Sequence, residues 1–117
     1  MLDSVLKESI ATLLCHILKI DSKDLSIGRD TFLDFMEEDF DDTDIGELQR
    51  LFDNIMKQKY DDIERHLSII SNALYNQPYL KMKILNQLNS MILKSGAGEI
   101  SDEDYEFFEK VKEALFN

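Results

Sequence analysis

The chain has 117 residues, and 44% of them are apolar, so we expect residues 1–117 to form one domain around a single core. Thirteen basic residues face 24 acidic ones, which gives a net charge of −11 at pH 7. A surface of this sign repels nucleic-acid phosphates and anionic lipid headgroups, so we expect neither a nucleic acid nor a membrane as partner. The absence of a long apolar run and the lone Cys15, which has no partner for a disulfide, favour a cytoplasmic protein.

Apolar residues recur with the 3.6-residue period of an α-helix along most of the chain, and no segment alternates as a strand does. The first predicted helix covers about Ser4–Lys19, and the second covers about Ile27–Glu38. The third begins near Asp44, which stands three residues before Glu47 in the spacing of a capping box.

The fourth predicted helix covers about Asp61–Tyr75, with carboxylates in its first turn, where they complement the helix dipole. Pro78 suits the first turn of the fifth helix, which ends near Gly96. Ser101 caps the sixth helix, and Asp104 follows three residues later. These elements predict an all-α fold, a compact bundle of about six or seven helices.

The two ends of the chain align with each other at a shift of 75 residues, without a gap. Each copy has an apolar helix, a short loop with acidic residues, a capped turn and a second helix. Two such hairpins would pack against each other, with the third and fourth helices connecting and covering them. The aligned segments are Ile17-Leu18-Lys19 with Ile92-Leu93-Lys94, Asp24-Leu25-Ser26 with Glu99-Ile100-Ser101, Phe32-Leu33 with Phe107-Phe108, and Met36 with Val111.

The two hairpins resemble the TerB-like tellurite-resistance family, whose pattern is an apolar helix, Asp-Gly-x-Ile-Ser/Thr-x-x-Glu and another apolar helix near both ends. The second copy matches at Gly98, Ile100 and Ser101, and Asp104 keeps a carboxylate at the Glu position. Ala97 stands where the family has Asp. The first copy matches mainly at Leu25 and Ser26, and Arg29 occupies its Glu position.

This resemblance implies an all-helical TerB-like domain, a link to tellurite and stress response, and a loop site in which acidic residues bind a metal. Six carboxylates lie within eight residues from Glu37 to Asp44, and a second acidic cluster follows Glu99. Carboxylate oxygens are the ligands that hard cations such as Ca²⁺ prefer. The candidate ligands are Glu37, Glu38, Asp39, Asp41, Asp42, Glu99 and Asp104. The ordinary interpretation of both clusters is a solvated loop and a capped helix start.

The remaining reactive side chains point to no catalytic site. His16 and His66 lie on different predicted helices, and Cys15 beside His16 is expected to be a half-buried thiol. We therefore expect no enzymatic activity and no cofactor other than a possible divalent cation. Tyr75 and Tyr79 border a predicted turn, and tyrosine is common at protein interfaces.

The sequence favours a non-enzymatic acidic binding module of the TerB-like type, whose partner is a protein with a basic patch. Two alternatives stay open at this point. One is a stress protein that binds a divalent cation, and the other is an acidic inhibitor of the immunity-protein kind.

Overall fold

The computed structural model describes residues 4–117, and this part of the chain forms six α-helices without a strand. The all-α class predicted from the sequence is therefore confirmed. No helix in the described range has the length and the apolar character that a membrane span requires. The helices are α1 (Ser4–Leu18), α2 (Leu25–Asp39), α3 (Ile45–Lys57), α4 (Ile63–Ala73), α5 (Pro78–Ser95) and α6 (Asp102–Phe116).

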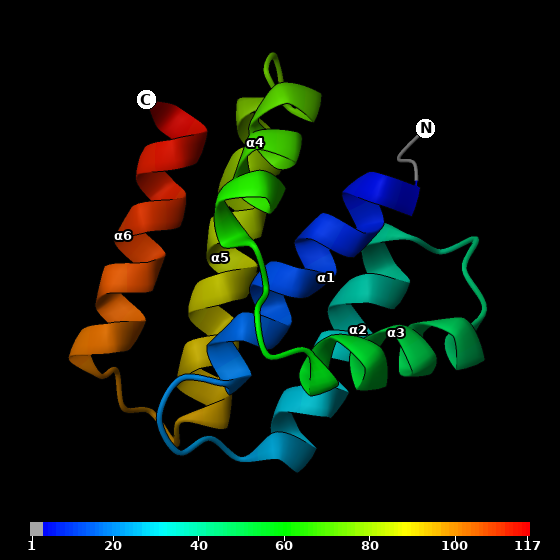
Figure 1. The fold of residues 1–117 in the computed structure, drawn as a ribbon, viewed down its shortest axis with the longest axis vertical. Coiled ribbons are helices and arrows are strands. Elements are labelled where there is room, and N and C mark those ends of the chain that lie inside the picture. Colours follow the sequence, from blue (N-terminus) through cyan, green and yellow to red (C-terminus); the bar gives the residue numbers. More distant parts are fainter. Residues whose placement is uncertain (1–3) are drawn as a thin grey trace.

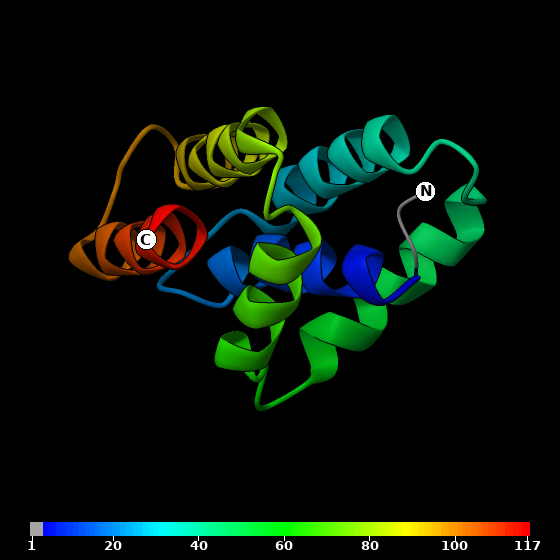
Figure 2. The ribbon, with the colours of Figure 1, turned by 90° about the horizontal axis from the view of Figure 1, so that it is seen from above.

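Helix α1 lies at the centre of the molecule, with α2, α3, α4 and α5 packed around it (Figures 1 and 2). Its buried side chains cover all sides of the helix, which is typical of a helix enclosed by others. Cys15 is fully buried, so the expectation of a half-buried thiol was wrong. The buried apolar residues of α1 are Leu6, Ile10, Ala11, Leu13, Leu14, Cys15, Ile17 and Leu18.

Helix α2 approaches α1 closely because Gly28 has no side chain. A Cβ atom at Gly28 would lie 2.4 Å from Leu18 Cδ2, inside any permitted contact distance. Helix α2 begins at Leu25, two residues before the predicted start, because the Asp24 carboxylate accepts a 3.0 Å hydrogen bond from Ile27 N and caps the helix there.

The loops that join α1 to α2 and α5 to α6 lie against each other. Asp24 N donates to Ser95 O at 2.8 Å, so the start of α2 meets the end of α5. The two aligned copies differ locally, however, because Leu25 belongs to the first turn of α2 whereas Ile100 precedes the cap of α6. The two loops therefore touch, but the helices that follow them, α2 and α6, begin two positions apart in the alignment.

Helix α4 begins at Ile63, so the predicted place of Asp61 in its first turn was wrong. Asp61 is instead buried. Its carboxylate binds His16 Nδ1, in α1, at 2.8 Å and Lys19 Nζ, just after α1, at 2.6 Å. These contacts fix the connection between α3 and α4 against the central helix.

Candidate functional site

The first predicted metal cluster, from Glu37 to Asp42 at the end of α2, does not converge on one point. Lys83 on α5 pairs with Glu38 at 3.2 Å and with Asp39 at 2.7 Å, and the hydrogen bond to Asp39 raises the pKa of the Lys83 ammonium. Asp39 also accepts a hydrogen bond from Gln87 at 2.9 Å. The other three predicted ligands of this cluster, Glu37, Asp41 and Asp42, are exposed.

The second predicted cluster lies at the other end of α2. Asp104 is buried, where one carboxylate oxygen accepts from Ser101 N at 3.0 Å and the other pairs with Lys23 Nζ at 2.9 Å. Glu99 is exposed in the loop before α6. Helix α2 is 15 residues long, roughly 22 Å, and it separates the two clusters. Within residues 4–117, no three His, Cys, Asp or Glu side chains are grouped as a metal site would require.

The two tyrosines predicted to mark an interface flank the turn between α4 and α5. Tyr75 and Tyr79 are 75% and 78% exposed, so both present their rings to solvent. Neither residue lines any of the larger hollows of the described structure.

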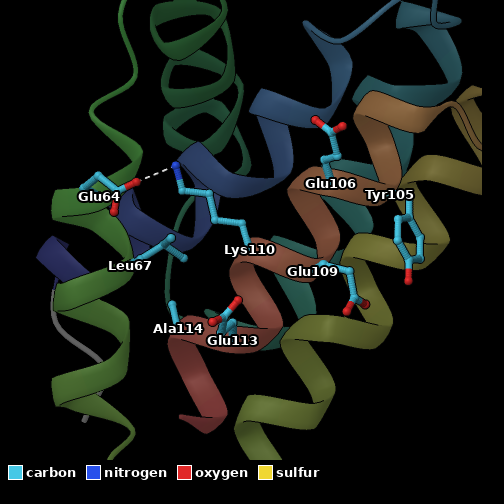
Figure 3. Close-up of a pocket in the computed structure, with 8 residues that line it drawn as sticks. All are labelled: Glu64, Leu67, Tyr105, Glu106, Glu109, Lys110, Glu113 and Ala114. Atoms are coloured by element: carbon cyan, nitrogen blue, oxygen red, sulfur yellow. Dashed lines mark ion pairs between the residues drawn. The ribbon is translucent and has the colours of Figure 1, made fainter.

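An open groove of about 470 Å³ runs along α6 beside α4. Helix α6 is held in place by its buried stripe of Phe107, Val111 and Leu115, and α4 by Leu67 and Ile70. These residues point into the core, and the flanking positions of both helices turn outward and form the groove, in which only the edge of Leu67 is exposed. The side chains that line it are Glu64 and Leu67 from α4 and Tyr105, Glu106, Glu109, Lys110, Glu113 and Ala114 from α6 (Figure 3).

The groove combines an apolar floor with acidic walls. Leu67 and Ala114 lie at its base, and Tyr105 is 60% exposed at one side. Four glutamates line the groove: Glu64 stands on the α4 side, whereas Glu106, Glu109 and Glu113 come from α6, with Glu109 on the side of α6 that is turned away from α4 (Figure 3). Lys110 is the single basic side chain among the eight residues that line it. Lys110 reaches from α6 to α4 and pairs with Glu64 (Figure 3). This charge distribution and this shape suit a cationic, partly apolar ligand.

A second hollow of about 410 Å³ lies next to the groove and shares Glu64 and Lys110 with it. Its walls include Tyr60 and the polar cluster of His16, Lys19 and Asp61. The cluster is closely held, because Lys19 Nζ also donates to Ile55 O at 2.7 Å and to Gln58 O at 3.0 Å. The His16 ring packs on Phe107 of α6 with 4.6 Å between ring centres.

Sequence reasoning missed the groove, although its acidic wall was visible in the sequence. Glu106, Glu109 and Glu113 follow one another at helical spacing beside the apolar stripe of α6. That pattern is also the ordinary one for a solvated helix face, and only the proximity of α4 makes it one side of a groove.

No family model, curated protein or solved structure matches this chain. The TerB-like resemblance therefore stays a prediction from the sequence.

Proposed function

We propose that the chain is a non-enzymatic binding module whose groove between α4 and α6 receives a basic amphipathic helix of a partner protein. The observation that carries this proposal is the set of four glutamates that line the groove together with Leu67 and Ala114. Acidic walls attract and orient a basic partner, and the exposed Tyr105 ring and the half-buried Ala114 offer the apolar contact that holds it.

A helix suits the groove because its acidic wall has the spacing of successive helical turns. Glu106 and Glu113 are seven residues apart on α6, a rise of about 10.5 Å. A partner helix with lysine or arginine at positions i, i+3 and i+7 would present cations at the same intervals. Its apolar side chains would then face Leu67 and Ala114.

Cation binding, the first alternative, receives less support from the contacts. Asp104 uses both carboxylate oxygens on Ser101 N and Lys23, and Asp39 uses both on Lys83 and Gln87. A metal ion would have to displace these protein donors. Within residues 4–117, Glu64 is the one glutamate of the groove that forms an ion pair, so a basic helix meets less internal competition at the other three.

The test is a titration of the protein with a synthetic amphipathic helix that carries arginine at i, i+3 and i+7 and leucine on the adjacent face. Amide chemical shifts should move mainly in α4 and α6 and should saturate. Replacing the acidic wall (Glu106→Gln, Glu109→Gln and Glu113→Gln) should weaken binding by about tenfold or more, because three charge contacts are lost.

The matched control removes three exposed carboxylates at the other predicted cluster: Glu37→Gln, Asp41→Asn and Asp42→Asn. Both triple variants reduce the net negative charge from −11 to −8, so they differ only in where the three charges are removed. The control should bind within about twofold of the natural sequence. Equal weakening in the two variants, or shifts centred outside α4 and α6, would show that the groove is not the binding site.

A further inference from the structure

The Lys110–Glu64 ion pair stands between the acidic groove and the neighbouring hollow, since both residues line both depressions. Lys110 starts from α6 and crosses to Glu64 on α4 (Figure 3), so the pair lies where the two depressions adjoin. The pair joins two residues that are more than forty positions apart in the sequence. It is thus a tertiary contact and not a local support of either helix.

The pair is also well placed to open. The side chains of Lys110 and Glu64 are 49% and 75% exposed, and exposed ion pairs of this kind contribute little to stability. The core beneath α6 is held by Phe107, Val111 and Leu115, which do not depend on Lys110. The Lys110 side chain can therefore leave Glu64 without disturbing the packing of α6.

We infer that Lys110 occupies, in the unbound protein, the position that the partner's anchoring cation takes in the complex. This inference rests on the proposed function of the groove. Lys110 neutralises Glu64 and fills the one acidic position at which the two depressions meet. An incoming arginine replaces it, because a planar guanidinium can hold the Glu64 carboxylate through two parallel hydrogen bonds, whereas an ammonium is a single charged point.

When the partner's arginine takes the place of Lys110 at Glu64, the binding groove also becomes longer. Once Lys110 leaves Glu64, the groove continues into the hollow lined by Tyr60, His16 and Asp61. The arginine side chain would then lie against the exposed Tyr60 ring, which is 79% exposed and can stack on a guanidinium. The preferred partner is accordingly a helix whose anchoring basic residue is arginine.

The experiment compares Lys110→Ala with Lys112→Ala, measured with the same synthetic arginine helix. Both changes remove one positive charge from α6, but Lys112 does not line the groove. Lys110→Ala should bind the helix about three- to fivefold more tightly than the natural sequence, and Lys112→Ala should stay within about twofold of it. Replacing the anchoring arginine of the helix by lysine should weaken binding to the natural protein.

A double-mutant cycle separates competition from general electrostatics. In the Glu64→Gln background, Lys110 has no carboxylate to release, so Lys110→Ala should change the affinity by less than about 1.5-fold. An equal gain in both backgrounds, or equal gains for Lys110→Ala and Lys112→Ala, would overturn the inference while leaving the groove as the binding site. Failure of the helix to bind the natural protein and both lysine variants would overturn the proposed function, and this inference with it.

Discussion

Ser9 and His66 form a polar contact inside the core, where α1 meets α4. Ser9 Oγ lies 2.8 Å from His66 Nδ1, and the two residues are 0% and 4% exposed. Burial lowers the pKa of His66 from its ordinary value of 6.5, and the neighbouring Arg65 lowers it further, against smaller opposing effects of Glu8, Asp62 and Asp61. The imidazole is therefore held neutral in the folded protein.

This burial predicts that the free energy of unfolding decreases as the pH falls below about 6.5. In that range the unfolded chain takes up a proton at His66, whereas the folded protein resists it until its own lower pKa is reached. Above 6.5 the residue is neutral in both states and has no effect. Urea unfolding at pH values from about 7.5 to about 5 should show this decline.

The variant His66→Gln provides the comparison for this prediction. Glutamine does not titrate, so the decline between pH about 6.5 and about 5 should largely disappear, although the variant is less stable at every pH. If the natural protein and the variant lose stability in parallel across that range, other groups are responsible.

Residues of this kind show where sequence reasoning stops. The pattern of α1 identified it as a helix, but four neighbouring helices decide that Cys15 is wholly buried and that burial raises its thiol pKa. Asp61 was expected in a helix turn, yet it binds His16, 45 residues away in the sequence. Periodicity within one helix carries no information about which distant side chain will meet it.

At the scale of elements, the Lys23–Asp104 pair joins the loop between α1 and α2 to the first turn of α6. Both side chains are 2% exposed, and Asp104 also completes the capping box of α6 with Ser101. Asp104→Ala would leave the Lys23 ammonium buried without its counter-charge and remove half of the cap. We expect a loss of about 3–5 kcal/mol in the free energy of unfolding, measured by chemical denaturation.

The double variant Lys23→Met with Asp104→Ala separates these two costs. Because it removes the buried charge as well as its partner, it should be more stable than Asp104→Ala alone by about 2 kcal/mol or more. The remaining deficit relative to the natural protein would measure the lost cap. A double variant that is no more stable than the single one would show that the buried lysine is not the main cost.

Ala97, two residues after the end of α5, has a backbone conformation that glycine adopts more easily. Its φ is +54°, in the left-handed region, and the next residue, Gly98, donates from its N–H to Leu93 O at 2.8 Å, which closes the helix end. Ala97→Gly should therefore stabilise the protein by about 0.5–1 kcal/mol, seen as a higher denaturation midpoint.

Gly98 supplies the matched control for that prediction. Its φ is +83°, and an added Cβ would meet no atom within 4 Å, so Gly98→Ala tests backbone conformation without a clash. That variant should be less stable than the natural protein by about 1 kcal/mol. The two substitutions should change the free energy of unfolding in opposite directions. An Ala97→Gly variant that is less stable than the natural protein would contradict this explanation.

The helices themselves were predictable because their apolar stripes and caps are local features. Ser101 and Asp104 cap α6 as the sequence indicates, and Pro78 begins α5. The start of α2 was misplaced because Asp24, and not a later residue, makes the capping hydrogen bond. Asp104 was predicted as a metal ligand from its place in the family pattern and its carboxylate, and its ion pair with Lys23, from the loop between α1 and α2, could not be seen from the sequence.

At the scale of the whole molecule, the candidate groove depends on an arrangement that no single segment contains. Helices α4 and α6 lie side by side, although all of α5 separates them along the chain (Figure 1). The acidic stripe on α6 and the apolar position Leu67 on α4 acquire a joint role only through this packing. Fold class was predictable from composition and periodicity, whereas the site required the tertiary arrangement.

The excess of acidic residues also predicts how the folded protein responds to salt. Carboxylates outnumber basic side chains by 24 to 13, so at least 11 of them have no basic side chain to pair with, and the excess negative charge repels itself when the chain is compact. Raising KCl from about 10 mM to about 300 mM screens this repulsion. If screening recovers about 1 kcal/mol, the melting temperature should rise by about 4 °C.

Whether the melting temperature rises or falls with KCl shows which interaction between surface charges is larger, the repulsion among carboxylates or the attraction within ion pairs. Salt also weakens exposed ion pairs such as Arg65–Asp62, but each of these contributes at most about 1 kcal/mol, and the excess negative charge outweighs them. The variant Glu37→Gln, Asp41→Asn and Asp42→Asn removes three charges from exposed positions, so its melting temperature at low salt should be higher and its rise with KCl smaller. A melting temperature that falls as KCl is added would mean that the ion pairs, and not the unpaired carboxylates, govern the stability of the folded state.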